Sequence, residues 1–137
     1  MNSFILDTHV WYWIIIGSNK IPGKIRNKIK SAIPAGNIKV SIISAWEIAM
    51  LESKGRIKMH INCLDWIKSA LTAPGISLCN LTPEIIYESI HLPGNVQNDP
   101  ADRIIIASAR ISNAILITKD KSTVGYSKSG YIKTLTW

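Results

Sequence analysis

Hydrophobic and polar positions divide the chain into short apolar runs and longer stretches with helical spacing. Short apolar runs between turn residues are typical of buried strands, whereas apolar residues repeating every three to four positions indicate helices. The runs predict strands at residues 3–6, 38–42, 76–81 and 114–118, and a last strand at 131–134. The longer stretches predict helices at residues 8–16, 21–33, 45–54, 62–73, 83–91 and 100–112.

The helix that begins at residue 100 has the clearest boundaries in the sequence DPADRIIIASAR. Asp99 suits the N-cap, Pro100 suits the first helical position, and Asp102 then falls at the third position. Five of the six residues from Ile104 to Ala109 are apolar, which indicates burial nearly all round. Asp102 therefore begins a buried helix and is expected to point towards the interior.

Strands that alternate with helices predict one α/β domain over residues 1–137. Its centre is expected to be a mostly parallel sheet of four to five strands, with helices on both faces. Ser44 is expected to cap the helix at 45–54, and residues 121–130 (KSTVGYSKSG) are expected to form a loop.

Four acidic side chains are expected to converge at one edge of this sheet. Asp7 and Asp120 each follow an apolar strand, and Asp102 and Glu47 lie near the beginnings of helices. Sites in parallel sheets form outside the carboxyl ends of the strands, where all four would meet. Taken singly, each acid also has an ordinary interpretation as a turn former, a cap, a favourable charge at a helix dipole or an exposed helical residue.

Clustered carboxylates indicate a bound cation, because protons or a multivalent ion must offset their repulsion. Oxygen ligands without nearby cysteine or histidine favour Mg²⁺ or Mn²⁺ over zinc. Sixteen basic residues oppose nine acidic ones, giving a net charge of +7, and outside the four clustered acids the net charge is +11. A basic protein with such a site suggests phosphodiester hydrolysis by metal-activated water, with one or two ions.

The cysteines, the histidines and the apolar run near the N-terminus argue against a zinc site and a membrane span. Cys63 and Cys79 are isolated from each other and are expected to be buried free thiols, as in a reducing cytoplasm. His9, His60 and His91 lack the spacing of metal ligands and are expected at the surface. The apolar run at residues 10–16 is too short for a membrane span, so no membrane association is expected.

Four segments carry a resemblance to a known family: ILDTHVWYW, SAWEIAMLESKGRI, NDPADRIIIASA and ILITKD. In this order they resemble the PIN-domain ribonucleases, specifically the VapC-type toxins of bacterial toxin–antitoxin pairs, over essentially the whole chain. The resemblance implies an RNA substrate, often tRNA or rRNA, a cognate antitoxin protein and a homodimer. It implies that the acidic quartet around Mg²⁺ or Mn²⁺ consists of Asp7, Glu47, Asp102 and Asp120.

The resemblance also implies lesser roles for three further residues. Asp99 matches an acid that assists through water, and Thr8 and Thr118 match polar positions beside the site. One departure is the segment Ser112, Asn113 and Ala114, where many relatives have a turn that contains glycine. This departure concerns a loop and leaves the acids intact.

Two other functions compete with a nuclease. A non-catalytic RNA- or antitoxin-binding module would bind RNA in a salt-sensitive manner without metal-dependent products. A phosphotransferase with Asp7 as nucleophile would need an acid where His9 stands, which argues against it. The tryptophans Trp11, Trp13, Trp46 and Trp66 suit either the core or base stacking, and as residues of apolar helices they are expected in the core. The apolar first helix also suits a dimer interface.

Overall fold

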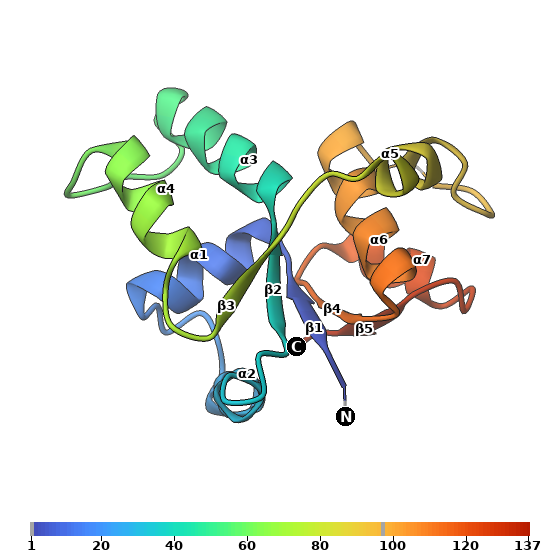
Figure 1. Ribbon diagram of the computed structural model, residues 1–137, viewed down its shortest axis with the longest axis horizontal. Coiled ribbons are helices and arrows are strands. Elements are labelled where there is room, and N and C mark those ends of the chain that lie inside the picture. The colour runs from blue at the N-terminus through green and yellow to red at the C-terminus, as the bar shows by residue number, and fades with distance from the viewer. Residues whose placement is uncertain (1, 97) are drawn as a thin grey trace.

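A five-stranded parallel sheet forms the centre of the molecule in the computed structural model, which describes residues 2–96 and 98–137 (Figure 1). The strand order is β3-β2-β1-β4-β5, and every pair of neighbours is parallel. The strands are β1 (Phe4–Leu6), β2 (Ile38–Ser41), β3 (Ile76–Cys79), β4 (Ile115–Ile117) and β5 (Lys133–Leu135). The predicted α/β architecture is therefore confirmed, with the N-terminal strand at its centre.

Seven helices of the described chain cover both faces of this sheet. They are α1 (Thr8–Ile16), α2 (Gly23–Ala32), α3 (Ile42–Ser53), α4 (Cys63–Leu71), α5 (Pro83–Ile90), α6 (Pro100–Ser112) and α7 (Lys121–Ser127). Figure 1 shows α1 and α4 on one side of the sheet and α5, α6 and α7 on the other.

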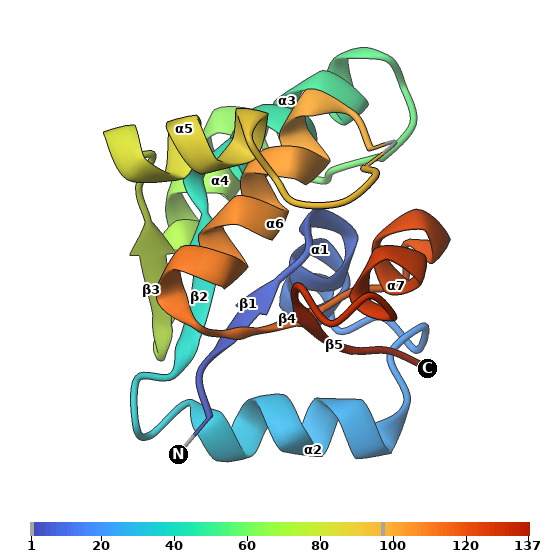
Figure 2. The same cartoon turned by 90° about the vertical axis from the view of Figure 1, so that its right-hand side faces the viewer.

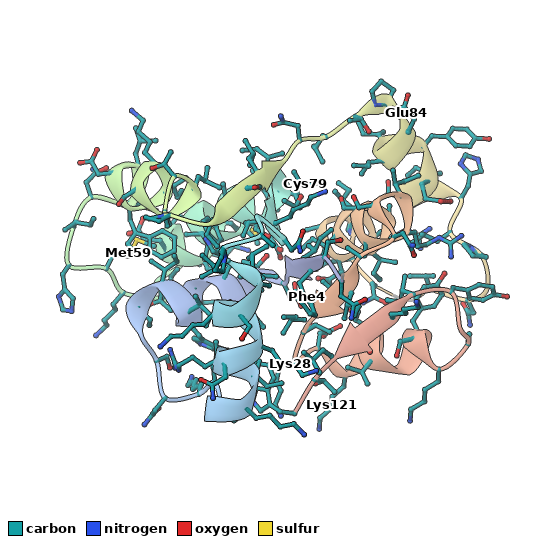
Figure 3. The ribbon with its side chains drawn as sticks, turned by 60° about the horizontal axis from the view of Figure 1, so that its bottom comes forward. Phe4, Lys28, Met59, Cys79, Glu84 and Lys121 are labelled. Carbon is teal, nitrogen blue, oxygen red and sulfur yellow. The ribbon has the colours of Figure 1, made fainter. Side chains whose placement is uncertain are left out.

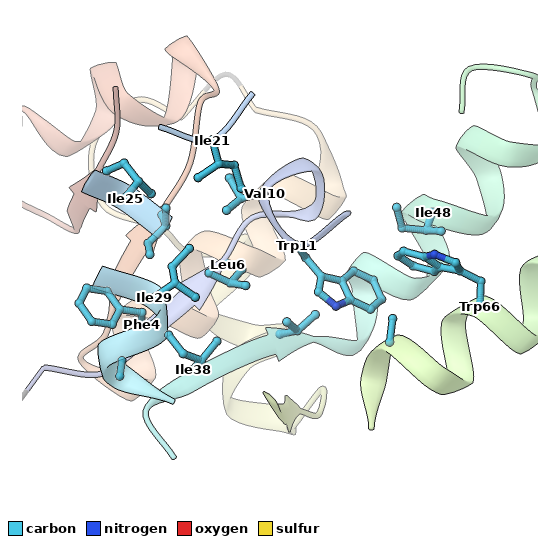
Figure 4. Close-up of a cluster of buried hydrophobic side chains, with 14 residues drawn as sticks. Phe4, Leu6, Val10, Trp11, Ile21, Ile25, Ile29, Ile38, Ile48 and Trp66 are labelled. Atoms are coloured by element: carbon cyan, nitrogen blue, oxygen red, sulfur yellow. The ribbon is translucent and has the colours of Figure 1, made fainter. Parts of the chain in front are cut away.

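Alternate residues of β1 feed two separate hydrophobic cores. Leu6 packs into the core that α1, α2 and α4 cover, whereas Ile5 packs into the core beneath α5 and α6. Figure 4 shows the first core, in which the fully buried Trp11 meets Trp66 edge to face with ring centroids 5.3 Å apart. Trp11 therefore belongs to the chain's own core. Trp46, by contrast, is 57% exposed.

Helix α6 forms as its cap residues predict. The Asp99 carboxylate accepts a hydrogen bond of 2.9 Å from the Asp102 backbone N–H, and Pro100 occupies the first turn. The helix ends at Asn113, whose φ of 50° is in the left-handed region that asparagine tolerates. Asn113 thus ends the helix at the turn for which the resemblance implies a glycine.

Two predictions near the carboxyl ends of the strands are wrong, and both errors involve caps. Helix α3 begins at Ile42 because Ser41, not Ser44, is the N-cap, and Ser44 is fully buried. Residues 121–127 form helix α7 instead of a loop, because the Asp120 side chain caps it by accepting from the Thr123 backbone N–H. Cys63 and Cys79 are free thiols, as predicted, but are only partly buried.

The two ends of the strands have different surroundings. Helix α2 lies at the end where the strands begin, and α1, α3 and α6 begin at the opposite end (Figure 2). Figure 3 shows α2 from the outside, with Lys28 on its exposed surface. No helix in the described part of the chain is long and apolar enough to cross a membrane.

Candidate active site

Acidic residues from separate segments meet at the carboxyl ends of the strands. Glu47 lies in the second turn of α3, and Asp99 and Asp102 lie at the beginning of α6. One carboxylate oxygen from each of these three side chains lies within 4.8 Å of the other two. This spacing allows the three groups to ligate a single cation.

More acidic neighbours act on Asp102 than on Asp7 or Glu47. Its burial, more than any other cause, raises the pKa of Asp102 to about 7. Four negative neighbours raise it as well, in decreasing order Asp99, Asp7, Glu47 and Asp120. Asp102 is therefore within electrostatic reach of the four other acids.

Asp7 is held in place by two hydrogen bonds as it leaves β1. One carboxylate oxygen accepts from the Thr8 backbone N–H at 2.9 Å, and the other accepts from the Thr118 hydroxyl at 2.5 Å. Burial raises the pKa of Asp7, although both hydrogen bonds act in the opposite direction. Thr118 is fully buried directly after β4, so it fixes the Asp7 carboxylate across the sheet.

Glu47 is oriented by a hydroxyl from a different helix. The Thr8 side chain donates to the Glu47 carboxylate at 2.5 Å, and its oxygen also lies 2.9 Å from the Ser44 hydroxyl oxygen. Burial raises the pKa of Glu47, and the charges of Asp7 and Asp99 raise it further. The Thr8 and Ser44 hydroxyls, both buried, thus connect the beginning of α1 to α3 beneath the acids.

Asp120 lies beside this trio and makes a separate set of contacts. One of its carboxylate oxygens accepts from the Thr123 backbone N–H at 2.9 Å and from the Thr123 hydroxyl at 2.7 Å. The same oxygen accepts from the Asn98 amide at 3.3 Å. Asn98 directly precedes Asp99, so it joins the segment before α6 to the cap of α7.

The structure thus places all seven predicted residues at one edge, but it orders them differently from the sequence analysis. Asp99, interpreted from sequence as a cap and helper, lies in the closest trio, whereas Asp7 and Asp120 lie around it. Sequence reasoning missed Asn98 and Thr123, and it misassigned Ser44. The adjacency of Asn98 to the DPADR segment was the one available signal.

A pocket of about 320 Å³ opens next to the acids. Its lining contains the two acids Asp7 and Asp120 together with His9, Val10, Trp13 and Lys119. It is large enough to admit a phosphate group and its sugar, and Lys119 supplies a positive charge at its rim.

The donor set fits a hard divalent cation. The converging ligands are carboxylate oxygens, and the three histidines of the chain are all exposed outside the trio. A divalent ion held here would offset both the burial and the negative charges that raise the pKa of Asp102. Such a centre can polarise a phosphate oxygen and activate water.

Comparison with known proteins gives a consistent result. A family model described as "PIN domain" matches residues 4–124. The chain is 32% identical over 122 residues to Ribonuclease VapC22 of Mycobacterium tuberculosis, covering 88% of this chain and 89% of that protein.

Solved structures with the same fold include chains of VapBC complexes. A chain of VapBC2 from Rickettsia felis, bound to a promoter DNA fragment, aligns with a TM-score of 0.69 at 16% identity, covering 98% of both chains. A chain of DNA-bound VapBC from Salmonella typhimurium aligns with a TM-score of 0.71 at 15% identity, covering 100% of this chain and 99% of that one. At these identities the likeness concerns the fold.

Proposed function

The chain belongs to the PIN-domain family and is of the VapC type, and from this premise we propose that it is a Mg²⁺- or Mn²⁺-dependent endoribonuclease. In this proposal it is the toxin of a toxin–antitoxin pair and hydrolyses RNA phosphodiester bonds. The observation that carries the proposal is the approach of three carboxylate oxygens, from Glu47, Asp99 and Asp102, to within 4.8 Å of one another.

The ligands proposed for the cation are the acidic quartet of Asp7, Glu47, Asp102 and Asp120. Asp102 and Glu47 lie in the closest trio together with Asp99, so Asp99 is near enough to act with them, directly or through water. When bound, the ion lowers the pKa of an attacking water and offsets the charge that develops on the phosphate. Hydrogen bonds from Thr123 hold the Asp120 carboxylate in one orientation, in which it would complete the quartet.

Thr8 and Thr118 are proposed to position these acids. Each hydroxyl hydrogen bonds to one carboxylate at 2.5 Å, Thr8 to Glu47 and Thr118 to Asp7. A carboxylate held in one orientation needs no reordering when a cation binds, which favours tight and selective binding.

Protein partners are proposed from the relatives and from the surface. The solved relatives are described as VapBC assemblies, which supports a cognate antitoxin. Large apolar side chains are exposed on α5, where Tyr87 is 66% and Ile90 68% exposed, and such faces are typical of interaction surfaces. We include a homodimer and a cytoplasmic location in the proposal.

A cleavage assay with labelled structured RNA tests the nuclease activity. We expect products with Mg²⁺ or Mn²⁺, none with EDTA, and none from Asp102→Asn or Asp7→Asn protein. Asp65→Asn is the matched control, because Asp65 occupies the same third position of a capped helix, α4, and is exposed. Undiminished cleavage by Asp102→Asn protein would overturn the proposal.

Metal binding can be measured without RNA. Mn²⁺ should raise the melting temperature of the wild-type and Asp65→Asn proteins, since a ligand that binds only the folded state stabilises it. The increase should be largely absent in Asp102→Asn protein. Equal increases in the melting temperature of all three proteins would show that Mn²⁺ binds at a site that does not include Asp102.

A further inference from the structure

A second groove runs along α1, next to the acidic site. It has a volume of about 370 Å³, and its lining includes His9, Trp13, Lys20, Arg56 and Lys58. Lys20 follows α1, whereas Arg56 and Lys58 belong to the segment after α3, so three cationic side chains come together from two parts of the chain. This groove is called the α1 groove below.

The charge of the α1 groove is not neutralised by the protein. No acidic residue lines it, and within residues 2–96 and 98–137 the structure contains one ion pair, between Arg110 and Glu88. The side chains of Lys20, Arg56 and Lys58 are exposed. Their positive charge is therefore available to an anionic ligand.

Aromatic rings accompany these charges. The Trp13 ring lies 5.4 Å from the Lys20 ammonium and 5.7 Å from the exposed His9 ring. Trp137 packs against Trp13 edge to face, with ring centroids 6.2 Å apart, which fixes its orientation. Positive charge interleaved with fixed aromatic rings is the arrangement that binds the backbone and bases of single strands.

The α1 groove is continuous with the active site. His9 and Trp13 line both this groove and the pocket that contains Asp7 and Asp120. Figure 1 shows α1 leading away from the carboxyl end of β1, and Asp7 is the residue between these two elements. The nine residues of α1 span about 13 Å, which is longer than one phosphate group.

We propose that the α1 groove binds the single-stranded RNA segment on one side of the bond that is cut. Lys20, Arg56 and Lys58 contact its phosphates, and Trp13 with His9 contacts a base. The inference rests on the proposed nuclease function, because it takes the acidic site as the place of cleavage. An acidic peptide is the competing ligand, but the aromatic rings and the continuity with the active site favour RNA.

The test compares two pairs of substitutions with equal change in charge. Lys20→Ala with Arg56→Ala alters the α1 groove, and Lys24→Ala with Lys28→Ala alters exposed lysines of α2, at the other end of the strands. Each full-length variant is titrated with a short fluorescein-labelled single-stranded RNA of randomised sequence, in EDTA, at several salt concentrations. Fluorescence anisotropy gives the affinity, and circular dichroism shows that each variant is folded.

We expect the groove variant to lose affinity about 10-fold and its salt dependence to fall by a slope of about 1.4, as for two lost phosphate contacts. The α2 variant should bind within about 2-fold of wild type. Equal losses in the two variants, or no loss in the groove variant, would overturn the inference. Tighter binding of a polyglutamate peptide than of RNA would overturn it as well.

Cleavage of the same RNA with Mn²⁺ separates this inference from the proposed function. Suppose that wild type cuts RNA and that the groove variant binds and cuts RNA as the α2 variant does. The inference about the α1 groove is then wrong, and the proposed nuclease function is retained. Suppose instead that neither wild type nor any variant cuts RNA and that only the groove variant has lost affinity. The proposed nuclease function is then wrong, and the α1 groove is retained as an RNA-binding site.

Discussion

The two ends of the same parallel strands are built in opposite ways. At the amino end, α2 buries Ile25 and Ile29 against the sheet and directs its lysines into water. At the carboxyl end, Asp7 and Glu47 are drawn inward, and burial raises the pKa of each carboxyl group. One end thus stabilises the fold, whereas the other imposes a cost on it.

This difference shows where selection for function is visible in a structure. Exposed lysines on an amphipathic helix require no special explanation, because each charge remains hydrated. Buried carboxylates that repel one another require a ligand or a proton to compensate them. Four predictions, in order of decreasing effect, test whether the amino end of the strands serves stability and the carboxyl end serves function.

The largest effect is expected from Glu47→Gln at the carboxyl end. The amide keeps the size of the side chain but loses the charge that faces Asp102, so RNA cleavage should fall about 1000-fold, or about 4 kcal/mol. Glu52→Gln is the control, because Glu52 lies in the same helix and is exposed. Single-turnover cleavage rates measure both variants, and equal rates would remove Glu47 from the site.

At the amino end, Ile29→Ala should affect stability instead. Ile29 is 1% exposed in the core beneath α2, and truncation of a buried isoleucine costs about 3 kcal/mol. Urea denaturation measures this loss, and the cleavage rate per folded molecule should stay at the wild-type value. If Ile29→Ala slowed cleavage by folded protein, the two ends would not be independent.

The third prediction concerns pH in the absence of metal. The folded pKa of Asp102, about 7, lies above its ordinary value of 3.8, so the folded chain holds a proton that the unfolded chain releases. The contribution of this group to stability is present below pH 4 and is lost as the pH rises to 7. Asp102→Asn protein does not undergo this loss.

The free energies of unfolding of the two proteins should therefore diverge between pH 4 and 7. The variant should become more stable, by an amount on the order of 2 kcal/mol after allowance for solvent screening at a half-buried group. Denaturation in EDTA at a series of pH values measures the divergence. Saturating Mn²⁺ should reverse the sign of this difference. Parallel curves in EDTA would show that the folded protein does not raise the pKa of Asp102.

The sequence predicted the features that depend on local pattern. Asp99 and Pro100 predict the beginning of α6. The acids that follow β1 and β4 lie at the same edge of the sheet because these strands are parallel. The features that it missed depend on distant partners. Ser44 is buried because its hydroxyl meets Thr8, which lies 36 positions away, and no periodicity within α3 reveals that contact.

Helix α7 was missed for a different reason. The segment contains Gly125 and several serines and lacks an apolar stripe, so composition favoured a loop. What forms the helix is the Asp120 cap, and the same residue was interpreted only as a member of the acidic cluster. Because a role in the acidic cluster already explained Asp120, its second role as a helix cap was not considered.

The smallest effect is expected from Thr118→Val, which tests positioning at the carboxyl end. Valine fills the buried site of Thr118 but donates no hydrogen bond to Asp7, so the carboxylate loses its partner from β4. Cleavage should fall about 10-fold, equivalent to about 1.4 kcal/mol, with a weaker response of the melting temperature to Mn²⁺. Thr118→Ser restores the donor and should recover most of both quantities. If Thr118→Val lost stability but kept the wild-type cleavage rate and Mn²⁺ response, Thr118 would only support the fold. The residues at the carboxyl end that serve the active site would then not include Thr118.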